Sequence, residues 1–205
     1  AKVRVVPNGT DALPVLPPIS KAKGPRIMYV GRISLEKGIG LLLDAFELVR
    51  DYVPNVELMI VGDWKSTPVS LRRRLQRAAH FGGVKLPGQI PREELGAYYA
   101  SGDLFLFGSL SETYGNVVAE AMASGLAVAA YRSAAAAEII ADGFSGRSVP
   151  PGDEAAFVSA ALGLALDGGL RRAIGRRARL DMETRGWPGV VERFEHVLRE
   201  AASHS

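Results

Sequence analysis

Two polar loops carry the residues of this 205-residue chain whose types and spacing could do chemistry. The first, at 31–38, follows the apolar run 26–30 and holds Arg32 and Lys37. A cation at the start of a helix is unfavourable, because the helix dipole is already positive there, unless an anion binds between them. The loop therefore predicts a phosphate site. The alternative is that Glu36 neutralises both cations on a solvated surface.

The second loop follows the apolar run 103–107 and opens a helix near Gly115. Free backbone amides at a helix start suit an anionic or hydroxyl-rich ligand. Asn116 and Glu120 share one face of this helix, and Glu112 lies on the loop ahead of it. Two carboxylate oxygens match the two hydroxyls of a ribose, and a second carboxylate could bind a sugar in the same way. Each glutamate alone would otherwise be solvated or ion-paired.

The elements that must position these loops are visible as apolar runs that alternate with helical patterns. Strands are expected at 26–30, 56–61, 103–107 and 127–131, with helices around 39–49, 69–79, 117–123 and 135–141, and later helices at about 153–167, 169–184 and 187–202. Such alternation predicts a parallel sheet sandwiched by helices, a doubly wound, Rossmann-like α/β fold. Ligands of such sheets bind at the carboxyl ends of the strands, so the loops after Val30, Val61, Leu86 and Phe107 are expected to carry the function.

The N-terminal segment has a different character. Residues 3–6 are expected to form a short strand that ends in the turn at 7–11. Residues 12–25 include Pro14, Pro17 and Pro18 and are predicted to form a connecting arm. At the other end, the helix from 187 carries Trp187, Val190, Val191, Phe194 and Leu198. These apolar side chains either pack on this domain or remain exposed for another surface.

The composition narrows the class of protein. With 47% hydrophobic and 23% charged residues, the chain is typical of a globular protein. Its longest apolar stretch, 157–166, falls short of the ~20 residues that cross a bilayer. The absence of cysteine excludes thiolate nucleophiles, disulfides and Cys-based zinc sites. No signal peptide is recognised at the start, so the expected location is the cytoplasm, with its membrane face as an alternative.

Charge argues against nucleic acid as a partner. The net charge is only +3, and the arginines cluster at 72–77 and 171–179 without interleaved aromatic residues. We interpret both clusters as solvated helix faces, with an anionic lipid surface as the alternative.

Several familiar motifs are missing. The sequence has no G-x-G-x-x-G, no P-loop, no G-x-S-x-G and no D-x-D pair to hold a divalent ion beneath a diphosphate. The three histidines are scattered. We therefore expect a ligand that binds without a metal or other cofactor.

Taken together, the motifs resemble the donor-binding, C-terminal half of retaining GT-B glycosyltransferases of family 4, which includes many bacterial mannosyltransferases. They are Pro7-Asn8-Gly9-x-Asp11, Gly31-Arg32-x-x-x-Glu36-Lys37-Gly38, Val61-Gly62-Asp63, Gly88, Tyr98-x-x-x-x-Asp103, the pair Glu112 and Glu120, and Glu120-Ala121-Met122-Ala123-Ser124-Gly125. One segment departs from the pattern, since in Ser133-Ala134-Ala135-Ala136-Ala137-Glu138 only alanines precede the glutamate, where members often have Gly-Gly. That alanine-rich version is similar to bacterial GDP-mannose-dependent enzymes.

The resemblance implies a role for each loop. Arg32 and Lys37 would bind the donor pyrophosphate and stabilise it as it departs, and Glu120 would take the ribose hydroxyls. Glu112 would position the transferred sugar rather than act as a nucleophile. The implied catalytic residues are Arg32, Lys37 and Glu112, and the implied donor-binding residues are Gly31, Arg32, Lys37, Gln89, Ile90, Glu112, Tyr114, Gly115, Asn116, Val117 and Glu120.

The resemblance also implies a domain organisation and a function. Residues 1–205 are expected to be a single nucleotide-sugar-binding domain, with 1–25 as an interdomain linker strand and Pro-rich arm, 187–205 as a terminal helix, and an N-terminal acceptor domain as its missing partner. The implied reaction moves a hexose from GDP-mannose or a UDP-sugar to a glycan or lipid acceptor, in bacterial cell-envelope polysaccharide or glycolipid synthesis. A non-catalytic nucleotide-sugar or phospho-ligand binding module is the alternative. A flavodoxin-like signalling domain would leave Arg32, Lys37 and the two glutamates unexplained.

Overall fold

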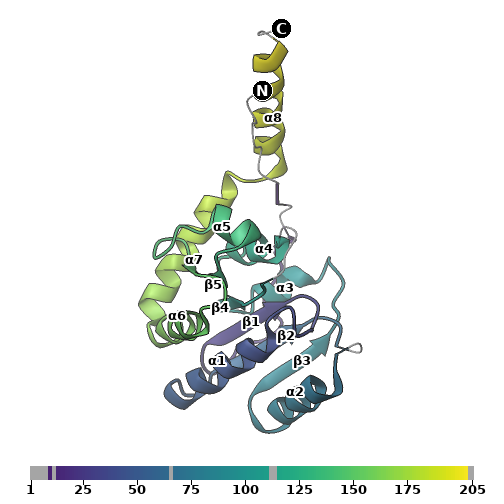
Figure 1. Ribbon diagram of the computed structural model, residues 1–205, viewed down its shortest axis with the longest axis vertical. Helices are drawn as coiled ribbons and strands as arrows, with labels where there is room; N and C mark the ends of the chain where they lie inside the picture. Colours follow the sequence, from purple (N-terminus) through teal and green to yellow (C-terminus); the bar gives the residue numbers. More distant parts are fainter. Residues whose placement is uncertain (1–8, 11–12, 65–66, 111–114, 203–205) are drawn as a thin grey trace.

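The computed structural model describes residues 9–10, 13–64, 67–110 and 115–202, and within them six strands and eight helices are placed (Figure 1). The elements are β1 (Arg26–Val30), α1 (Ile39–Tyr52), β2 (Glu57–Val61), α2 (Val69–Phe81), β3 (Val84–Gly88), α3 (Leu95–Tyr99), β4 (Leu104–Phe107), α4 (Asn116–Ala123), β5 (Ala127–Tyr131), α5 (Ala134–Ile139), β6 (Arg147–Val149), α6 (Glu154–Leu166), α7 (Gly168–Glu183) and α8 (Trp187–Ala202). The strand expected at 3–6 and the motif residues Pro7, Asn8 and Asp11 lie outside the described residues.

The strands form one parallel sheet in the order β3-β2-β1-β4-β5-β6. The chain builds outward from β1 to β3, returns to the other side of β1 as β4, and then builds outward again to β6. The point where the winding reverses therefore lies between β1 and β4, at the centre of the sheet in Figure 1. The doubly wound, Rossmann-like fold is confirmed.

The central strands are buried along their whole length. Every residue of β1, β4 and β5 is buried, as expected for strands covered by helices on both faces. Helix α1 packs beside α6, and α4 packs beside α7. The core between these layers holds the sheet rigid, so the loops at its carboxyl edge have fixed starting points.

The expected boundaries differ from the structure at the edges of the sheet. Strand β3 runs to Gly88 rather than ending at Leu86, because an edge strand tolerates Pro87, whose missing N–H costs no ladder hydrogen bond there. The short helix α3 and the three-residue strand β6 were not predicted. Helix α5 ends at Ile139, two residues before the expected 141.

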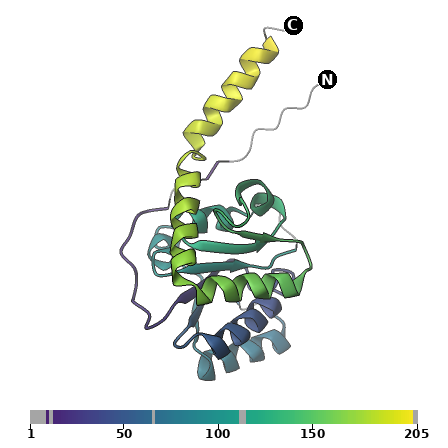
Figure 2. The ribbon, with the colours of Figure 1, turned by 90° about the vertical axis from the view of Figure 1, so that its left-hand side faces the viewer.

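Helix α8 projects from the end of α7 away from the rest of the domain (Figures 1 and 2). Val190 is buried, but Trp187, Val191, Phe194 and Leu198 are about half exposed. Of the two alternatives weighed for this helix, exposure is confirmed for these four side chains, and packing on this domain holds for Val190. In the part of the chain that the structure describes, no helix combines the length and the apolar character that crossing a membrane requires.

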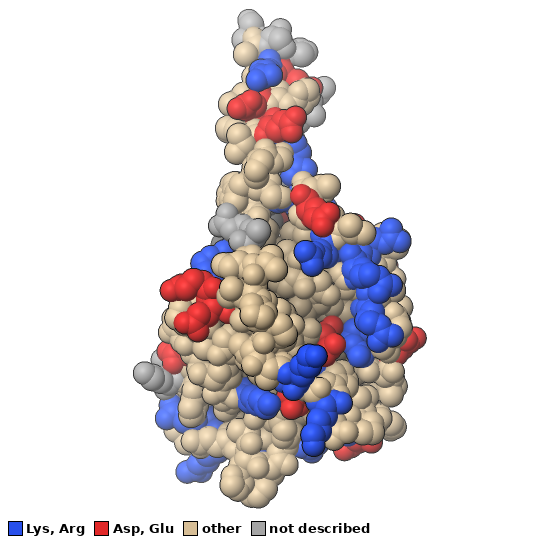
Figure 3. All heavy atoms as spheres, turned by 180° about the vertical axis from the view of Figure 1, so that it is seen from behind, with Lys and Arg blue, Asp and Glu red and all other residues tan. Residues whose placement is uncertain are grey.

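Two of the clustered arginines, Arg74 and Arg171, connect elements of the domain. Arg74 pairs with Asp44 and Glu47 of α1, at 2.6 and 3.1 Å. Arg171 donates to the carbonyl oxygens of Leu164 and Ala165, at 2.9 Å each, and so caps the end of α6. In Figure 3 basic side chains gather along one side of the body beneath α8, and elsewhere on this face both signs of charge occur. The two arginine clusters therefore include side chains that stabilise the fold, in addition to the solvated helix faces that the sequence predicts.

Candidate functional site

The two polar loops meet at the reversal point of the sheet. The loop after β1 ends at Gly38, which has a φ of 71° and precedes α1. A Cβ atom at Gly38 would overlap the carbonyl oxygen of Gly108, the first residue after β4. Only glycine permits both this backbone conformation and this close approach. The two loops therefore meet at the carboxyl edge of the sheet, the edge at which ligands of such folds bind.

The loop after β1 is anchored by its neighbours on both sides. The Tyr29 hydroxyl donates to the carbonyl oxygen of Arg32 at 2.8 Å, and the Gly31 amide donates to the carbonyl oxygen of Val61 at 3.0 Å. A Cβ atom at Gly62 would overlap the carbonyl oxygen of Gly31, so this contact also depends on glycine. The path of the loop is fixed before any ligand arrives.

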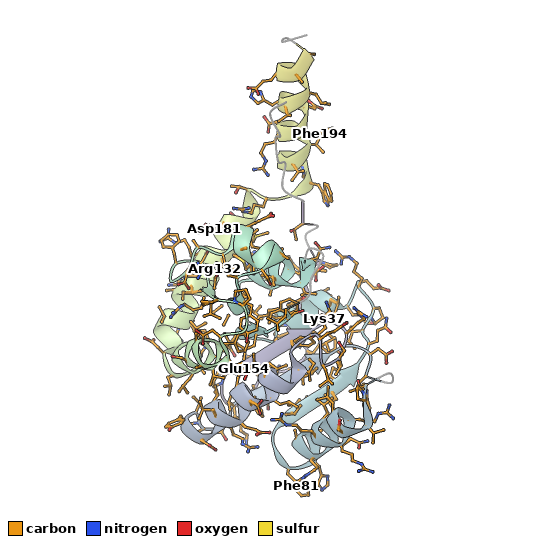
Figure 4. The ribbon with its side chains drawn as sticks, viewed as in Figure 1. Lys37, Phe81, Arg132, Glu154, Asp181 and Phe194 are labelled. Atoms are coloured by element: carbon orange, nitrogen blue, oxygen red, sulfur yellow. The ribbon has the colours of Figure 1, made fainter. Side chains whose placement is uncertain are left out.

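The two cations of this loop occupy different environments. Arg32 is largely exposed and pairs with Glu36 at 3.1 Å, in the manner expected of local neutralisation. An exposed pair of this kind contributes only ~0–1 kcal/mol, so an incoming anion can compete with Glu36 for Arg32. Lys37 is half-buried and stands beside the first turn of α1 (Figure 4). Gly38 offers no side chain to cap that turn, which leaves amide donors for an anion.

The loop after β4 leads into a second helix start. Gly115 has a φ of 87° and precedes α4, again without a side-chain cap. Asn116 is exposed and Val117 is half-buried at this start, as the predicted contact with a ligand requires. The predicted site residues Glu112 and Tyr114 lie outside the described residues.

Glu120 is the most unusual residue of the site. Its carboxylate is buried within α4 between the fully buried Ala119 and Ala121 and forms an ion pair with Arg92. Of the alternatives weighed from the sequence, the solvated side chain is therefore wrong and the ion-paired one is present. Oε1 accepts from Arg92 Nη1 at 2.9 Å, and Oε2 accepts from the Tyr99 hydroxyl at 3.1 Å. Each oxygen keeps one further acceptor direction, because an ionised carboxylate has about four lone-pair sites.

The Tyr99 hydroxyl is held in its donor form. Burial raises the pKa of Tyr99 well above its ordinary value, and the negative charge of Glu120 raises it further. The hydroxyl therefore keeps its proton at neutral pH and donates to Oε2. Arg92, by contrast, is 57% exposed while its partner Glu120 is 5% exposed. The carboxylate has one fixed, internal partner and one that reaches it from the surface.

The β3–α3 loop brings a third group of predicted residues to the same edge. The Gly62 amide donates to the carbonyl oxygen of Gly88 at 2.9 Å, which ties the end of β3 to the end of β2. Gln89 is exposed and Ile90 packs against the core just beyond this point. Arg92 belongs to the same loop and was missed by the sequence analysis, because no local signal connects it with Glu120.

The predicted donor residues that the structure describes thus gather at one edge of the sheet. They are Gly31, Arg32, Lys37, Gln89, Ile90, Gly115, Asn116, Val117 and Glu120, which follow the ends of β1, β3 and β4. Over the described ranges, no three His, Cys, Asp or Glu side chains cluster in a way that could hold a metal ion. The edge offers cations, helix amides and one buried carboxylate, which suits an anionic, hydroxyl-bearing ligand.

Comparison with known proteins gives a consistent result. Residues 24–167 match the family described as Glycosyl transferases group 1. The sulfoquinovosyl transferase SQD2 of Arabidopsis thaliana is 32% identical over 181 residues, which is 87% of this chain and 34% of that protein. A phosphatidyl-myo-inositol mannosyltransferase of Mycolicibacterium smegmatis is 30% identical over 199 residues, which is 94% of this chain and 50% of that protein.

The fold has solved counterparts as well. The structure of sucrose-phosphate synthase from Thermosynechococcus elongatus superimposes with a TM-score of 0.79 at 26% identity, covering 98% of this chain and 53% of that one. The present chain therefore spans between about a third and about half of the length of these three relatives.

Proposed function

The chain belongs to the group 1 glycosyl transferases, and from that premise we propose that it is the nucleotide-sugar-binding half of a retaining hexosyltransferase. The observation that carries the proposal is the contact between two loops at the reversal point of the sheet, each of which leads into a helix start without a side-chain cap, α1 and α4. Arg32 and Lys37 lie on one side of this point, and the buried carboxylate of Glu120 lies on the other. A nucleoside diphosphate presents two phosphates and a ribose diol, which are the groups this arrangement can bind.

In the proposed reaction, the residues of the first loop stabilise the departing diphosphate. Charge grows on the diphosphate as its bond to the sugar breaks, and Arg32, Lys37 and the amides of α1 are already in place to receive it. These cations would do what a divalent ion does elsewhere, so we propose transfer without a metal. Glu112 would position the sugar.

The donor and the acceptor are also proposals. The relatives are named for different transferred groups, sulfoquinovosyl and mannosyl among them, so GDP-mannose and UDP-sugars remain the two donor classes. A glycan or lipid acceptor in a bacterial cell envelope, reached from the cytoplasm or from the membrane's inner face, fits the phosphatidyl-myo-inositol in the name of one relative. The acceptor would be held by a second, N-terminal domain.

Replacing Arg32 or Lys37 with alanine tests the proposed phosphate site. Each change removes a charge-assisted contact worth ~1.5–3 kcal/mol, so binding of GDP or UDP should weaken at least tenfold. Binding of the corresponding nucleoside should change less than twofold, because it carries no phosphate. Isothermal calorimetry with both ligands measures the difference.

Lys21→Ala provides the matched control, since Lys21 is exposed on the arm ahead of β1 and its loss changes the net charge equally. It should leave binding unchanged. Equal losses for nucleoside and diphosphate in Arg32→Ala and Lys37→Ala would show that this loop does not bind phosphate.

Glu120→Ala tests the ribose contact. In the unmodified protein a 2′-deoxynucleotide leaves one charged hydrogen bond unmade, worth ~1.5 kcal/mol, and should bind about tenfold more weakly than the ribonucleotide. Glu120→Ala should bind the ribonucleotide and the 2′-deoxynucleotide equally well, as measured by competition calorimetry. Glu120→Gln, which keeps the shape of the side chain, separates the contact from any packing defect. A full ribose preference in both variants would remove Glu120 from the site.

A further inference from the structure

Two buried tyrosines direct their hydroxyl groups at the proposed donor site from below. The Tyr29 hydroxyl donates to the backbone of Arg32 at 2.8 Å, and the Tyr99 hydroxyl donates to Glu120 Oε2 at 3.1 Å. Both tyrosines are at most 1% exposed. Neither group can reach a ligand, yet each holds a residue that the proposed function requires.

The two tyrosines are connected by an unbroken row of aromatic rings. The ring centroids of Tyr29 and Phe107 lie 6.1 Å apart, those of Phe107 and Phe105 lie 6.0 Å apart, and those of Phe105 and Tyr99 lie 6.0 Å apart. All three distances fall in the ~4.5–7 Å range of favourable aromatic pairs. Because buried rings in such contact have little freedom, the row fixes one hydroxyl relative to the other.

Packing alone does not explain the hydroxyl groups. A phenylalanine would fill either end of the row, and a buried hydroxyl is costly unless it is hydrogen-bonded. At one end the hydroxyl sets the path of the loop, since a Cβ atom at Gly31 would lie 3.1 Å from the Tyr29 oxygen. At the other end it fixes Oε2 of Glu120, while the partner of Oε1, Arg92, is more than half exposed. Tyr99 is therefore the permanent partner of the carboxylate.

We propose that Tyr29 and Tyr99 are positioning residues for the nucleotide, joined by the aromatic row. Tyr29 aims the loop that carries Arg32 at the diphosphate, and Tyr99 aims Glu120 at the ribose. This inference rests on the proposed function and deepens it, because it assigns separate residues to the positioning of two parts of one ligand.

The test uses Tyr29→Phe and Tyr99→Phe, which keep the rings and remove only the hydroxyls. Calorimetry compares a nucleoside diphosphate, its 2′-deoxy form and the nucleoside. Tyr99→Phe should reduce the ~10-fold ribose preference to about twofold and leave the gain from the diphosphate within twofold of the unmodified value. Tyr29→Phe should weaken diphosphate binding about fivefold to tenfold and leave the ribose preference unchanged.

Two controls separate positioning from general stability. Tyr131→Phe removes a hydroxyl from another buried tyrosine, whose ring packs on Phe157 instead, at 5.4 Å between ring centroids. Tyr131→Phe should change neither the preference for ribose over 2′-deoxyribose nor the preference for the diphosphate over the nucleoside. Tyr99→Phe made in the Glu120→Ala background should have no further effect on ribose preference, because Tyr99 acts through Glu120. Thermal unfolding of each variant gives its folded fraction.

The outcomes are distinguishable. Either tyrosine variant could bind all three ligands more weakly by the same factor, together with a lower Tm. That result would mean that the hydroxyls only stabilise the fold, and it would overturn the inference. If the unmodified protein prefers ribose over 2′-deoxyribose and the diphosphate over the nucleoside, and both tyrosine variants keep these preferences, the inference alone is overturned. An unmodified protein with neither preference would overturn the proposed function and the inference with it.

Discussion

The 205-residue chain on its own is expected to bind a nucleoside diphosphate and to transfer no detectable sugar. The chain spans 34% to 50% of the curated relatives described above, so the proposed acceptor site would come from the rest of such a protein. Group transfer requires both reactants to be held together in a cleft that excludes water. In the proposed function, the edge of the sheet that carries Arg32 and Gly115 would supply the donor side of such a cleft.

The measurement uses radiolabelled GDP-mannose and UDP-glucose, with and without a chelator. The Mycolicibacterium smegmatis mannosyltransferase serves as the positive control for the assay. Joining the chain to the part of this relative that it does not match should produce transfer that the chelator does not abolish. Chelator-sensitive transfer by the chain alone would contradict both the two-domain and the metal-free proposals. A non-catalytic binding module would remain inactive in every combination.

The central architecture could be predicted because its signals are local. Strand β5 begins and ends at the predicted residues Ala127 and Tyr131, and α8 spans the predicted range. Buried parallel strands appear in the sequence as short apolar runs, and the helices between them appear as apolar residues repeated at helical spacing. The fold class also placed the candidate loops at the carboxyl ends of the strands, but the strand order, and with it the reversal between β1 and β4, came from the structure.

The elements that were missed depend on contacts distant in sequence. Helix α3 has only five residues, and its Gly96 lies against the carbonyl oxygen of Pro14, so the arm and the helix define each other. Strand β6 contains the polar pair Arg147 and Ser148 and acquires its strand character by pairing with β5. Neither contact can be predicted from a short stretch of the sequence.

The burial of Glu120 was missed for the same reason. Its position on α4 was predictable, but its partners come from 28 and 21 residues earlier in the chain. The Tyr98-x-x-x-x-Asp103 motif pointed to the right segment, yet nothing in it distinguished buried Tyr99 from its neighbour. Spacing on a helix predicts which side chains share a face, and only the tertiary structure shows what covers that face.

One buried cation holds the segment before the sheet to the sheet itself. Arg26 is 0% exposed at the start of β1 and donates to Glu57 Oε2 at 2.9 and 3.1 Å. It also donates to the carbonyl oxygens of Ser20 and Ser101, at 3.2 Å each. The arm, the α3–β4 turn and β2 therefore share one guanidinium. Removing it would leave two carbonyl groups and a partly buried carboxylate without this donor.

Arg26→Ala is expected to lower the free energy of unfolding by about 3 kcal/mol, since breaking a buried ion pair costs roughly 3–5 kcal/mol and Glu57 keeps Lys85 as a partner at 3.2 Å. Burial alone would raise the pKa of Glu57, but hydrogen bonds from Arg26 and Lys85 outweigh it and lower that pKa. The ionised pair therefore stabilises the fold above the unfolded-state pKa near ~4.3, and this stabilisation is lost as the pH falls through the lower folded-state value. Urea unfolding at pH 7 and at about pH 3 should show that the difference in free energy of unfolding between variant and unmodified protein is smaller in acid.

Arg147→Ala is the control, because it breaks the exposed pair with Asp142. It should lower the free energy of unfolding by at most ~1 kcal/mol at pH 7. An equal loss in both variants would show that the burial of Arg26 adds nothing to stability.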